Sequence, residues 1–474
     1  MPVYNLAEPN KYLPGVGFVK RSFLLIGSNL LKLFVQLAII FLYSRHLSLK
    51  DYGLYQSVWL YINIAGVIAL FGLPSIILSA SAKNIKAWIN ANGNYFYPLV
   101  LLMNILPVLY IFFGNSFFDF HTKMLLTALT VAQNISIIAE TIAIKKEKEI
   151  RVLISNIIFI TGYFICHFLI LKNGYNLQVL LSWLILVYII KSAFLWNISS
   201  KAISVSNISL KSLGTQWIYL GLFDVISVLF KWLDKWLILF FVSVTQFAIY
   251  YNGAYEIPVF ALMLSAVGNI MVVELSRHSL NPEKVKLLFN NSSLFLASIV
   301  FPSFCFFFFY HYEVFTFIFS SKYQESIPVF LISIFIIPLR ITNFTAALQV
   351  YDRSDLVLKG AVIDLFVAVV LVIILYPLLK FQGLALAFVL STYVQAGYYL
   401  WHTAELVGKK IGYFIPFVKL IILMLISIII TGAFYFAFGK SVLSYNLLSG
   451  IIICTILIGS FLSWYLWQKK VTIA

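Results

Sequence analysis

The sequence predicts an all-α integral membrane protein with about 14 transmembrane helices. Of its 474 residues, 62% are hydrophobic and only 11% are charged, whereas an average soluble domain is about 25% charged. A soluble chain of this size would lack the charges to cover its surface, so the composition excludes a cytosolic enzyme, a secreted domain and a disordered scaffold. Fourteen separate windows are long and apolar enough to cross a bilayer, which requires about 20 residues each.

The windows are arranged as two sets of six followed by a pair. We expect spans at 20–43, 53–75, 95–117, 122–144, 152–172 and 177–198, then at 216–242, 247–273, 287–310, 326–350, 358–379 and 382–403, and finally at 413–438 and 445–467. Short links near Ser243–Gln246 and Lys380–Gly383 separate two of these pairs. The predicted organisation is a cytoplasmic segment (1–19), a first lobe (20–198), a cytoplasmic linker (199–215), a second lobe (216–403) and a helix pair with a short tail (404–474).

Basic residues indicate the orientation of the chain. With a cytoplasmic N-terminus, 20 of the 33 Lys and Arg residues fall in cytoplasmic segments, seven in outer segments and six inside spans. Lys and Arg collect on the cytoplasmic side of membrane proteins, so this bias predicts that both termini are cytoplasmic. The net charge of +16 therefore requires no nucleic-acid partner.

Motifs for other chemistry are absent from the sequence. Cys166, Cys305 and Cys454 lie in separate apolar runs, and the histidines lack metal-ligand spacing. No Gly-x4-Gly-Lys-Ser/Thr loop, serine elbow or metal signature is present, so we expect no ATP site, no metal cofactor and no enzymatic activity. The energy for transport would then come from an ion gradient (H⁺ or Na⁺), the membrane potential or substrate flux.

An internal repeat relates two links between spans. Ser48–Tyr55 aligns with Ser243–Tyr250, and both read Ser, three variable residues, an aromatic, a small residue, an aliphatic residue and Tyr. Each copy follows the first span of a set of six, which predicts two pseudo-symmetric lobes of parallel topology, an arrangement that suits alternating access. The alternative is that both are ordinary helix–turn–helix links with an interfacial tyrosine.

Ionisable residues inside the predicted spans are candidates for function. Each costs roughly 2.5–3.5 kcal/mol at mid-bilayer if it faces lipid, so we expect them to face protein or a water-filled cavity. Nine such residues lie well inside the spans: Lys32, Asp224, Lys231, Asp234, Lys235, Glu256, Arg340, Asp364 and Lys419. The four that belong to span 216–242 fall within an arc of roughly 100°, which predicts one polar face on this helix.

Some of these residues have ion-pair partners within reach. Asp234 can pair with Lys231 or with Lys235 on its own helix. Lys235 and Glu256 lie about 12 and 15 Å from the turn that joins their spans, so they can also meet. Such pairs would join helices structurally.

The remaining charges are given one of three roles: forming an ion pair, binding substrate or lying at the membrane interface. Arg340 and Asp364 have similar depths and are expected to form a structural or coupling pair. Lys32 and Lys231 are left as a surplus of positive charge, which favours an anionic substrate. Lys419 lies near a cytoplasmic helix end and is expected to extend its ammonium to the interface.

Two parts of the sequence resemble a known family of transporters. They are Arg45–Tyr55 after the first span, and Leu233–Leu239 with Phe247–Ile257 around the link between the seventh and eighth spans. They resemble the polysaccharide-transporter branch of the multidrug/oligosaccharidyl-lipid/polysaccharide (MOP) superfamily, in particular its O-antigen and capsule flippases (Wzx-type). The extra pair at 413–467 is instead typical of lipid II flippases. Those carry several cavity arginines, whereas the first two spans here offer Lys32 and no arginine within the membrane core.

The resemblance implies how the helices and site are arranged. The two lobes would form a V around a central cavity lined mainly by the first, second, seventh and eighth spans. Lys32 and Lys231 would bind a diphosphate. Asp234, Lys235 and Glu256 would gate or couple, and Tyr251, Asn252 and Tyr255 would contact the glycan. Asp224 would be a further residue of the cavity wall.

The implied function is a flippase in the bacterial cytoplasmic (inner) membrane. It would move a polyprenyl (undecaprenyl) pyrophosphate-linked oligosaccharide of the O-antigen or capsule type from the cytoplasmic to the outer leaflet. Membrane lipids and the polysaccharide polymerase and chain-length machinery are the implied partners. A lipid II flippase and an ion-coupled small-solute or multidrug exporter are the alternatives, and a membrane polymerase or ligase is disfavoured because no large outer loop is present.

Overall fold

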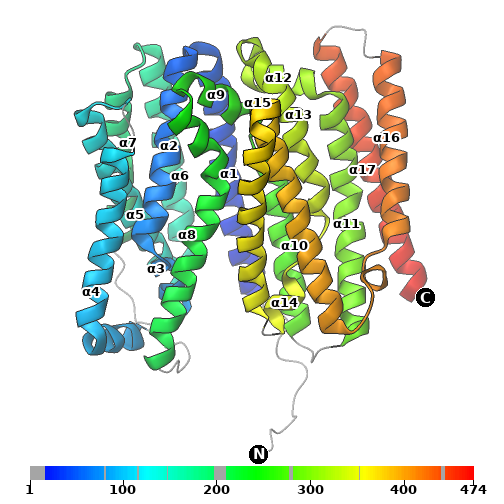
Figure 1. Ribbon diagram of the computed structural model, residues 1–474, viewed down its shortest axis with the longest axis horizontal. Helices are drawn as coiled ribbons and strands as arrows, with labels where there is room; N and C mark the ends of the chain where they lie inside the picture. Colours follow the sequence, from blue (N-terminus) through cyan, green and yellow to red (C-terminus); the bar gives the residue numbers. More distant parts are fainter. Residues whose placement is uncertain are drawn as a thin grey trace, which may run out of the picture. The chain divides into compact units, whose positions relative to one another are not determined.

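The structure, a computed structural model, describes residues 16–79, 82–114, 117–146, 148–196, 210–276, 281–351, 353–438 and 443–473. These residues form helices and no strands, which confirms the predicted all-α class (Figure 1). The chain divides into two compact units: unit 1 holds Met1–Leu47 and Ser57–Leu229, and unit 2 holds Ser48–Gln56 and Phe230–Ala474. Most of the predicted segment 1–19 and of the linker 199–215 lies outside the described residues.

Unit 1 is built from the first seven helices and the beginning of the eighth. The helices are α1 (Val16–His46), α2 (Leu49–Leu70, from Ser57 onwards), α3 (Leu73–Ser79), α4 (Ala82–Phe113), α5 (Phe120–Lys145), α6 (Glu149–Lys172), α7 (Leu177–Trp196) and the first part of α8 (Leu210–Phe241). In this unit α5, α6 and α7 pack against one another, and α1 packs along α6. Polar side chains that project from these four helices can therefore meet inside the unit.

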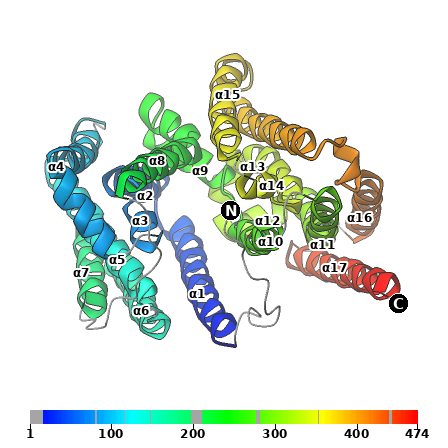
Figure 2. The same cartoon turned by 90° about the horizontal axis from the view of Figure 1, so that it is seen from below.

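Unit 2 contains the first turns of α2 (Ser48–Gln56), the second part of α8 (from Phe230) and the remaining helices. The remaining helices are α9 (Val244–Gly253), α10 (Pro258–Ser276), α11 (Pro282–Phe309), α12 (His311–Phe319), η1 (Ser321–Ser326), α13 (Ile327–Ser333), η2 (Ile334–Ile341), α14 (Ala346–Val350), α15 (Ser354–Val407), η3 (Ile411–Tyr413), α16 (Phe417–Phe438) and α17 (Leu443–Ile473). The C-terminal pair α16 and α17 packs against α11 (Figure 2). Residues 404–474 thus belong to unit 2 instead of standing as a separate domain.

Every predicted span coincides with a helix or a short series of helices. Ten described helical segments are long and apolar enough to cross a membrane, which supports a multi-pass membrane protein, while the count of 14 and the side on which the termini lie stay predictions. One of the ten is α15, which contains a break at Lys380 (φ 51°, ψ −126°) where the sequence predicted the link between two spans. Gly383 is required there, because a Cβ would lie 2.2 Å from the Leu375 carbonyl oxygen.

Two predicted spans are discontinuous helices. The span predicted at 247–273 is divided into α9 and α10 by the irregular residues 254–257, immediately before Pro258. The span predicted at 326–350 is divided into α13, η2 and α14, with Pro338 inside η2. Proline lacks a backbone N–H and its ring displaces the preceding turn, which accounts for both breaks.

The repeated motif forms helix caps. The hydroxyl oxygen of Ser243 accepts a hydrogen bond from the Gln246 N–H at 3.1 Å, and Ser48 Oγ accepts one from the Asp51 N–H at 3.1 Å. Both serines therefore begin a helix by satisfying an otherwise unpaired amide. The two copies also contact each other in unit 2, because Gly53 lies so close to Val244 that a Cβ would meet its carbonyl oxygen at 2.3 Å.

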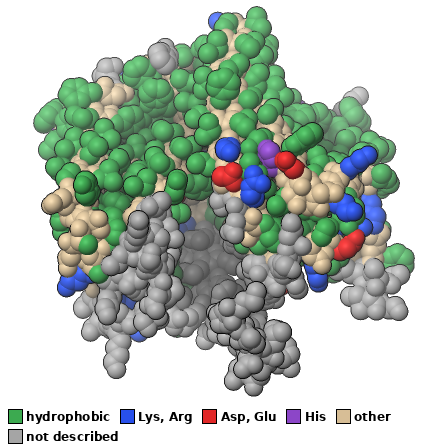
Figure 3. Space-filling model, turned by 60° about the horizontal axis from the view of Figure 1, so that its bottom comes forward, with side chains coloured by type: hydrophobic (Ala, Val, Ile, Leu, Met, Phe, Trp, Pro, Cys, Tyr) green, Lys and Arg blue, Asp and Glu red, His purple; other side chains and the backbone are tan. Residues whose placement is uncertain are grey.

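Charged side chains lie mainly at helix ends. Figure 3 brings the lower end of Figure 1 forward and shows Lys, Arg, Asp, Glu and His side chains there, beside a largely hydrophobic surface along the helices. In unit 2 this end holds the start of α11, both ends of α15 and the end of α17 (Figure 1), all of which were predicted to lie at the cytoplasmic face. These four helix ends therefore share one side of unit 2, as the predicted order of spans requires.

Candidate functional site

A charged cluster inside unit 1 joins four helices. Glu140 of α5 lies between two lysines, with its Oε2 2.6 Å from Lys191 Nζ of α7 and its Oε1 3.5 Å from Lys32 Nζ of α1. Asn156 Nδ2 of α6 donates to the same Oε1 at 3.3 Å. Two lysines and one glutamate leave a formal net charge of +1 on what we call the Glu140 cluster.

The cluster changes the interpretation of Lys32. The sequence left Lys32 as surplus positive charge, but in the structure its ammonium shares Glu140 with Lys191. Sequence reasoning missed Glu140 and Lys191 because they lie close to the predicted ends of their spans. The sequence did carry a signal for both residues, because they lie inside the predicted spans 122–144 and 177–198.

Asp234 is an anchor inside unit 2. It is 5% exposed and therefore faces protein, as expected for a charge inside a span. Its Oδ2 accepts a hydrogen bond from the Tyr250 hydroxyl at 2.9 Å and lies 3.1 Å from Lys235 Nζ. The predicted Asp234–Lys235 pair is therefore present, and Lys235 is not paired with Glu256.

Lys231 and Asp224 are more accessible than Asp234 on the same helix, α8. Lys231 is exposed and Asp224 is half-buried. No acid in the described part of the chain forms an ion pair with Lys231. The positive charge of Lys231 thus remains uncompensated, as the sequence indicated.

The predicted glycan-contacting residues surround the break between α9 and α10. Tyr251 stacks on Trp232 at 6.1 Å between ring centroids, and Tyr255 meets Phe319 edge to face at 5.8 Å. Asn252 is fully buried and its Oδ1 accepts from Gln56 Nε2 at 2.7 Å. The side-chain amide of Asn252 therefore fastens the start of α2 to α9, whereas the two tyrosines remain partly exposed.

The second ion pair of unit 2 corrects a prediction. Arg340 Nη2 lies 2.5 Å from Glu256 Oε1, so Arg340 pairs with Glu256 and not with Asp364. Asp364 is 2% exposed. The prediction assumed a continuous α-helix, but residues 334–341 form a 3₁₀ segment with non-helical dihedrals at Arg340, which changes both the depth and the direction of the side chain.

This pair joins the two discontinuous spans to each other. Glu256 follows α9 and Arg340 ends the 3₁₀ segment. Broken membrane helices are a recurrent feature of transporter binding sites, because unwound backbone at membrane depth is tolerated where it is buried in protein or lines a water-filled cavity. The region around residues 251–256 and 340 is therefore a candidate binding region within unit 2.

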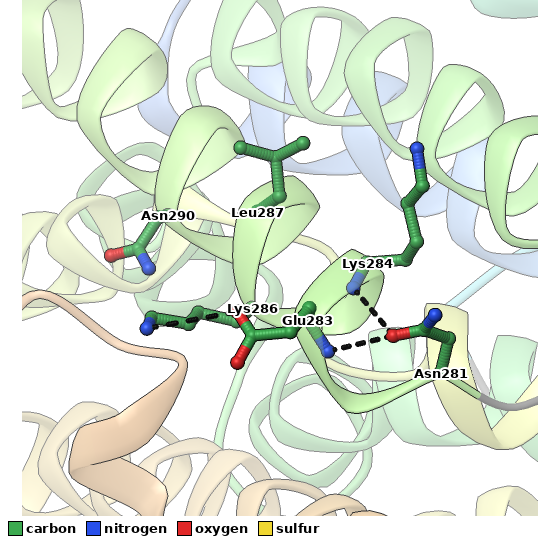
Figure 4. Close-up of a pocket in the computed structure, with 6 residues that line it drawn as sticks. All are labelled: Asn281, Glu283, Lys284, Lys286, Leu287 and Asn290. Carbon is green, nitrogen blue, oxygen red and sulfur yellow. Dashed lines mark hydrogen bonds and ion pairs between the residues drawn. The ribbon is translucent and has the colours of Figure 1, made fainter. Parts of the chain in front are cut away.

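A shallow pocket at the start of α11 lies apart from the predicted residues. Its lining is Asn281, Glu283, Lys284, Lys286, Leu287 and Asn290 (Figure 4). Asn281 Oδ1 accepts from the N–H groups of Glu283 and Lys284, and Lys286 lies 3.8 Å from the Glu283 carboxylate. Because these groups largely satisfy one another, the pocket is interpreted as a capped helix end. Among the described residues no group of three or more His, Cys, Asp or Glu is placed to hold a metal ion.

Together, these features define a multi-pass helical membrane protein with broken spans and an uncompensated cationic cluster. A family model described as "Polysaccharide biosynthesis protein" matches residues 42–328, more than half of the chain. The chain therefore belongs to this family, and the resemblance to polysaccharide transporters is confirmed. A comparison with curated protein sequences found no match.

Solved structures share the fold. The structure of the lipid II flippase MurJ in an inward closed conformation has a TM-score of 0.71 at 15% identity, covering 96% of this chain and 100% of that one. An inward-facing multidrug resistance MATE family transporter of the MOP superfamily has a TM-score of 0.54 at 13% identity, covering 79% and 94%. The chain thus shares its fold with a lipid flippase and with a multidrug transporter.

Proposed function

We propose that this protein is a flippase that moves a polyprenyl-diphosphate-linked oligosaccharide from the cytoplasmic to the outer leaflet of the bacterial inner membrane. The observation that carries the proposal is the net positive Glu140 cluster at Lys32, in a chain of the polysaccharide biosynthesis family. A diphosphate is the anionic part of such a substrate, and cationic sites in low-dielectric surroundings concentrate anions.

Other features support the same function. The chain folds as two compact units, and alternating access operates by motion of one unit against another. The broken spans of unit 2 carry Tyr251, Tyr255 and the Glu256–Arg340 pair, which are aromatic and polar groups suited to a sugar. The polysaccharide polymerase and chain-length machinery are proposed as partners that receive the translocated oligosaccharide.

A lipid II flippase is the second candidate. The observation in its favour is the fold shared with MurJ over almost the whole chain. A small-solute or multidrug exporter is supported by the MATE structure at a lower TM-score. Cationic drugs would be repelled by the uncompensated charge at Lys32 and Lys231, so we place this candidate third.

Leaflet transfer in proteoliposomes tests the proposal. The purified protein is given a labelled polyprenyl-diphosphate oligosaccharide, with lipid II as a parallel substrate and with imposed H⁺ or Na⁺ gradients or a membrane potential. We expect transfer of the oligosaccharide lipid. Transfer of lipid II alone would replace the first candidate by the second, and transfer of neither would contradict both.

Lysine variants connect the assay to the site. Lys32→Met is expected to lower transfer about tenfold or more, since a hydrogen bond to a charged group is worth roughly 1.5–3 kcal/mol. Lys419→Met is the matched control, because Lys419 is exposed, lies near a helix end and donates a hydrogen bond to Gln468 Oε1 at 3.3 Å. Lys231→Ala is expected to abolish transfer and Lys231→Arg to retain part of it.

A further inference from the structure

The charge balance of the Glu140 cluster depends on a residue that is hidden from any ligand. Lys191 has a side chain that is 6% exposed, whereas the Lys32 side chain is 27% exposed. The Lys191 ammonium lies 2.6 Å from Glu140 Oε2 and 5.1 Å from the centre of the Phe159 ring. Lys191 is therefore enclosed by its anion and an aromatic face, while Lys32 is the accessible member.

The two lysines share Glu140 unequally. Glu140 Oε2 is occupied by Lys191 at 2.6 Å, while the distance from Oε1 to Lys32 is 3.5 Å and Asn156 donates to the same oxygen at 3.3 Å. The short contact to Lys191 neutralises most of the Glu140 charge. Lys32 consequently keeps a positive charge that its own surroundings do not cancel.

We infer that Lys191 is a positioning residue which, by neutralising Glu140, keeps the Lys32 ammonium available to an anionic head group of the phosphate or diphosphate type. Without Lys191, Glu140 would turn to Lys32, and the two would form a neutral pair with little attraction for an anion. This inference rests on the proposed function in taking the anion to be the diphosphate of a lipid-linked substrate. The hidden lysine, which touches no ligand, would thereby set the affinity.

The inference predicts an order of affinities that follows the net charge of the cluster. Lys191→Met makes the cluster neutral, so binding of an anion should weaken by roughly ten- to hundredfold, the loss of one hydrogen bond to a charged group. The double variant Glu140→Gln/Lys191→Met also removes the Glu140 carboxylate, so the Lys32 ammonium again has no anion beside it. This variant should bind the anion within about threefold of the wild-type affinity. Lys191→Arg keeps the charge and should bind as the wild type does.

A merely structural role gives a different order. If the cluster only holds helices together, removing either charge destabilises the unit, and removing both does not restore the affinity of Lys32. The double variant also contains no unpaired buried charge, which guards against a failure to fold, because breaking a buried pair is far more destabilising than replacing both partners. Thermal unfolding in detergent is recorded for every variant.

The experiment measures binding of fluorescent polyprenyl diphosphate to full-length protein in lipid nanodiscs, with neutral polyprenol as a control. Inorganic pyrophosphate binding is measured separately. Weak binding by Lys191→Met with restoration in the double variant supports the inference. Wild-type affinity in Lys191→Met, or a double variant as weak as Lys191→Met, overturns the inference while the proposed function stands.

The two remaining outcomes separate the inference from the function. If the wild type fails to bind the lipid but pyrophosphate binding follows the predicted order, the lipid substrate is wrong and the anion site is supported. If the wild type binds neither probe, the inference is overturned together with the proposed function.

Discussion

Asp234 offers a quantitative test of how unit 2 is held together. Its carboxylate is buried and receives the Tyr250 hydroxyl at 2.9 Å and Lys235 Nζ at 3.1 Å. Asp234→Asn leaves the Lys235 ammonium, with a side chain only 15% exposed, without an anion. Breaking a buried pair in this way costs about 3 kcal/mol or more.

Tyr250→Phe probes the other contact of the same carboxylate. Removing a hydrogen bond to a charged group costs about 1.5–2 kcal/mol. In the Asp234→Asn background the amide oxygen can still accept from Tyr250, but as a neutral group, so Tyr250→Phe should then cost only about 0.5–1 kcal/mol. The double-mutant cycle should therefore give a coupling energy of about 1 kcal/mol.

The cycle is measured as free energies of unfolding by SDS titration in mixed micelles. Tyr251→Phe is the matched control, because Tyr251 is adjacent and stacks on Trp232 through its ring, which the substitution retains. The control should change the free energy by less than about 0.5 kcal/mol and add to Asp234→Asn. Additivity of Asp234→Asn and Tyr250→Phe within about 0.5 kcal/mol would refute the assignment of Asp234 as the anchor of α9.

Three further predictions concern other contacts. Arg340→Glu should lower transport in the leaflet-transfer assay, and the charge exchange Glu256→Arg/Arg340→Glu should recover part of it. If Arg340 were paired with another acid, the exchange would recover nothing. Ser243→Ala should lower the free energy of unfolding by about 1 kcal/mol, because it removes the cap of α9; an unchanged SDS midpoint would contradict this. The Thr122 hydroxyl donates to Asp119 and lowers the pKa of that carboxyl below its usual value. Because this folded-state pKa is depressed, the contribution to stability is present above about pH 4 and is lost as the pH falls through the folded pKa. Unfolding midpoints between about pH 5 and 3 should therefore fall less steeply in Thr122→Ala than in the wild type, and equal slopes would count against it.

Local features of the fold could be predicted from the sequence because their causes are local. The turn at Ser243 follows from a capping residue between two apolar runs, and the serine hydroxyl does cap α9. The break near Lys380 follows from the length of residues 354–407, which exceeds what one membrane crossing requires. The membrane-protein class and the helix positions could be predicted from the sequence for the same reason.

Contacts between distant residues could not be predicted from depth alone. Arg340 and Asp364 were assigned similar depths, but the direction of each side chain depends on helical geometry that a 3₁₀ segment does not share. The Glu140 cluster brings together residues 32, 140 and 191 from three helices. Its formation depends on how α1, α5, α6 and α7 pack, which no spacing in the sequence contains.

The distribution of compensated and uncompensated charges narrows the possible cargo. In unit 2, Asp234 with Lys235 and Glu256 with Arg340 form pairs of one acid and one base, so neither pair attracts an ion of either sign over a distance. Lys231 forms no ion pair in the described part of the chain, and Lys32 retains part of its charge because Lys191 occupies Glu140. The positive charges that the described site residues leave uncompensated are thus lysines that the sequence assigned to a diphosphate. A cationic cargo would meet repulsion at both positions, whereas an anionic group would be attracted by each, so the charge balance favours an anionic cargo over cationic drugs.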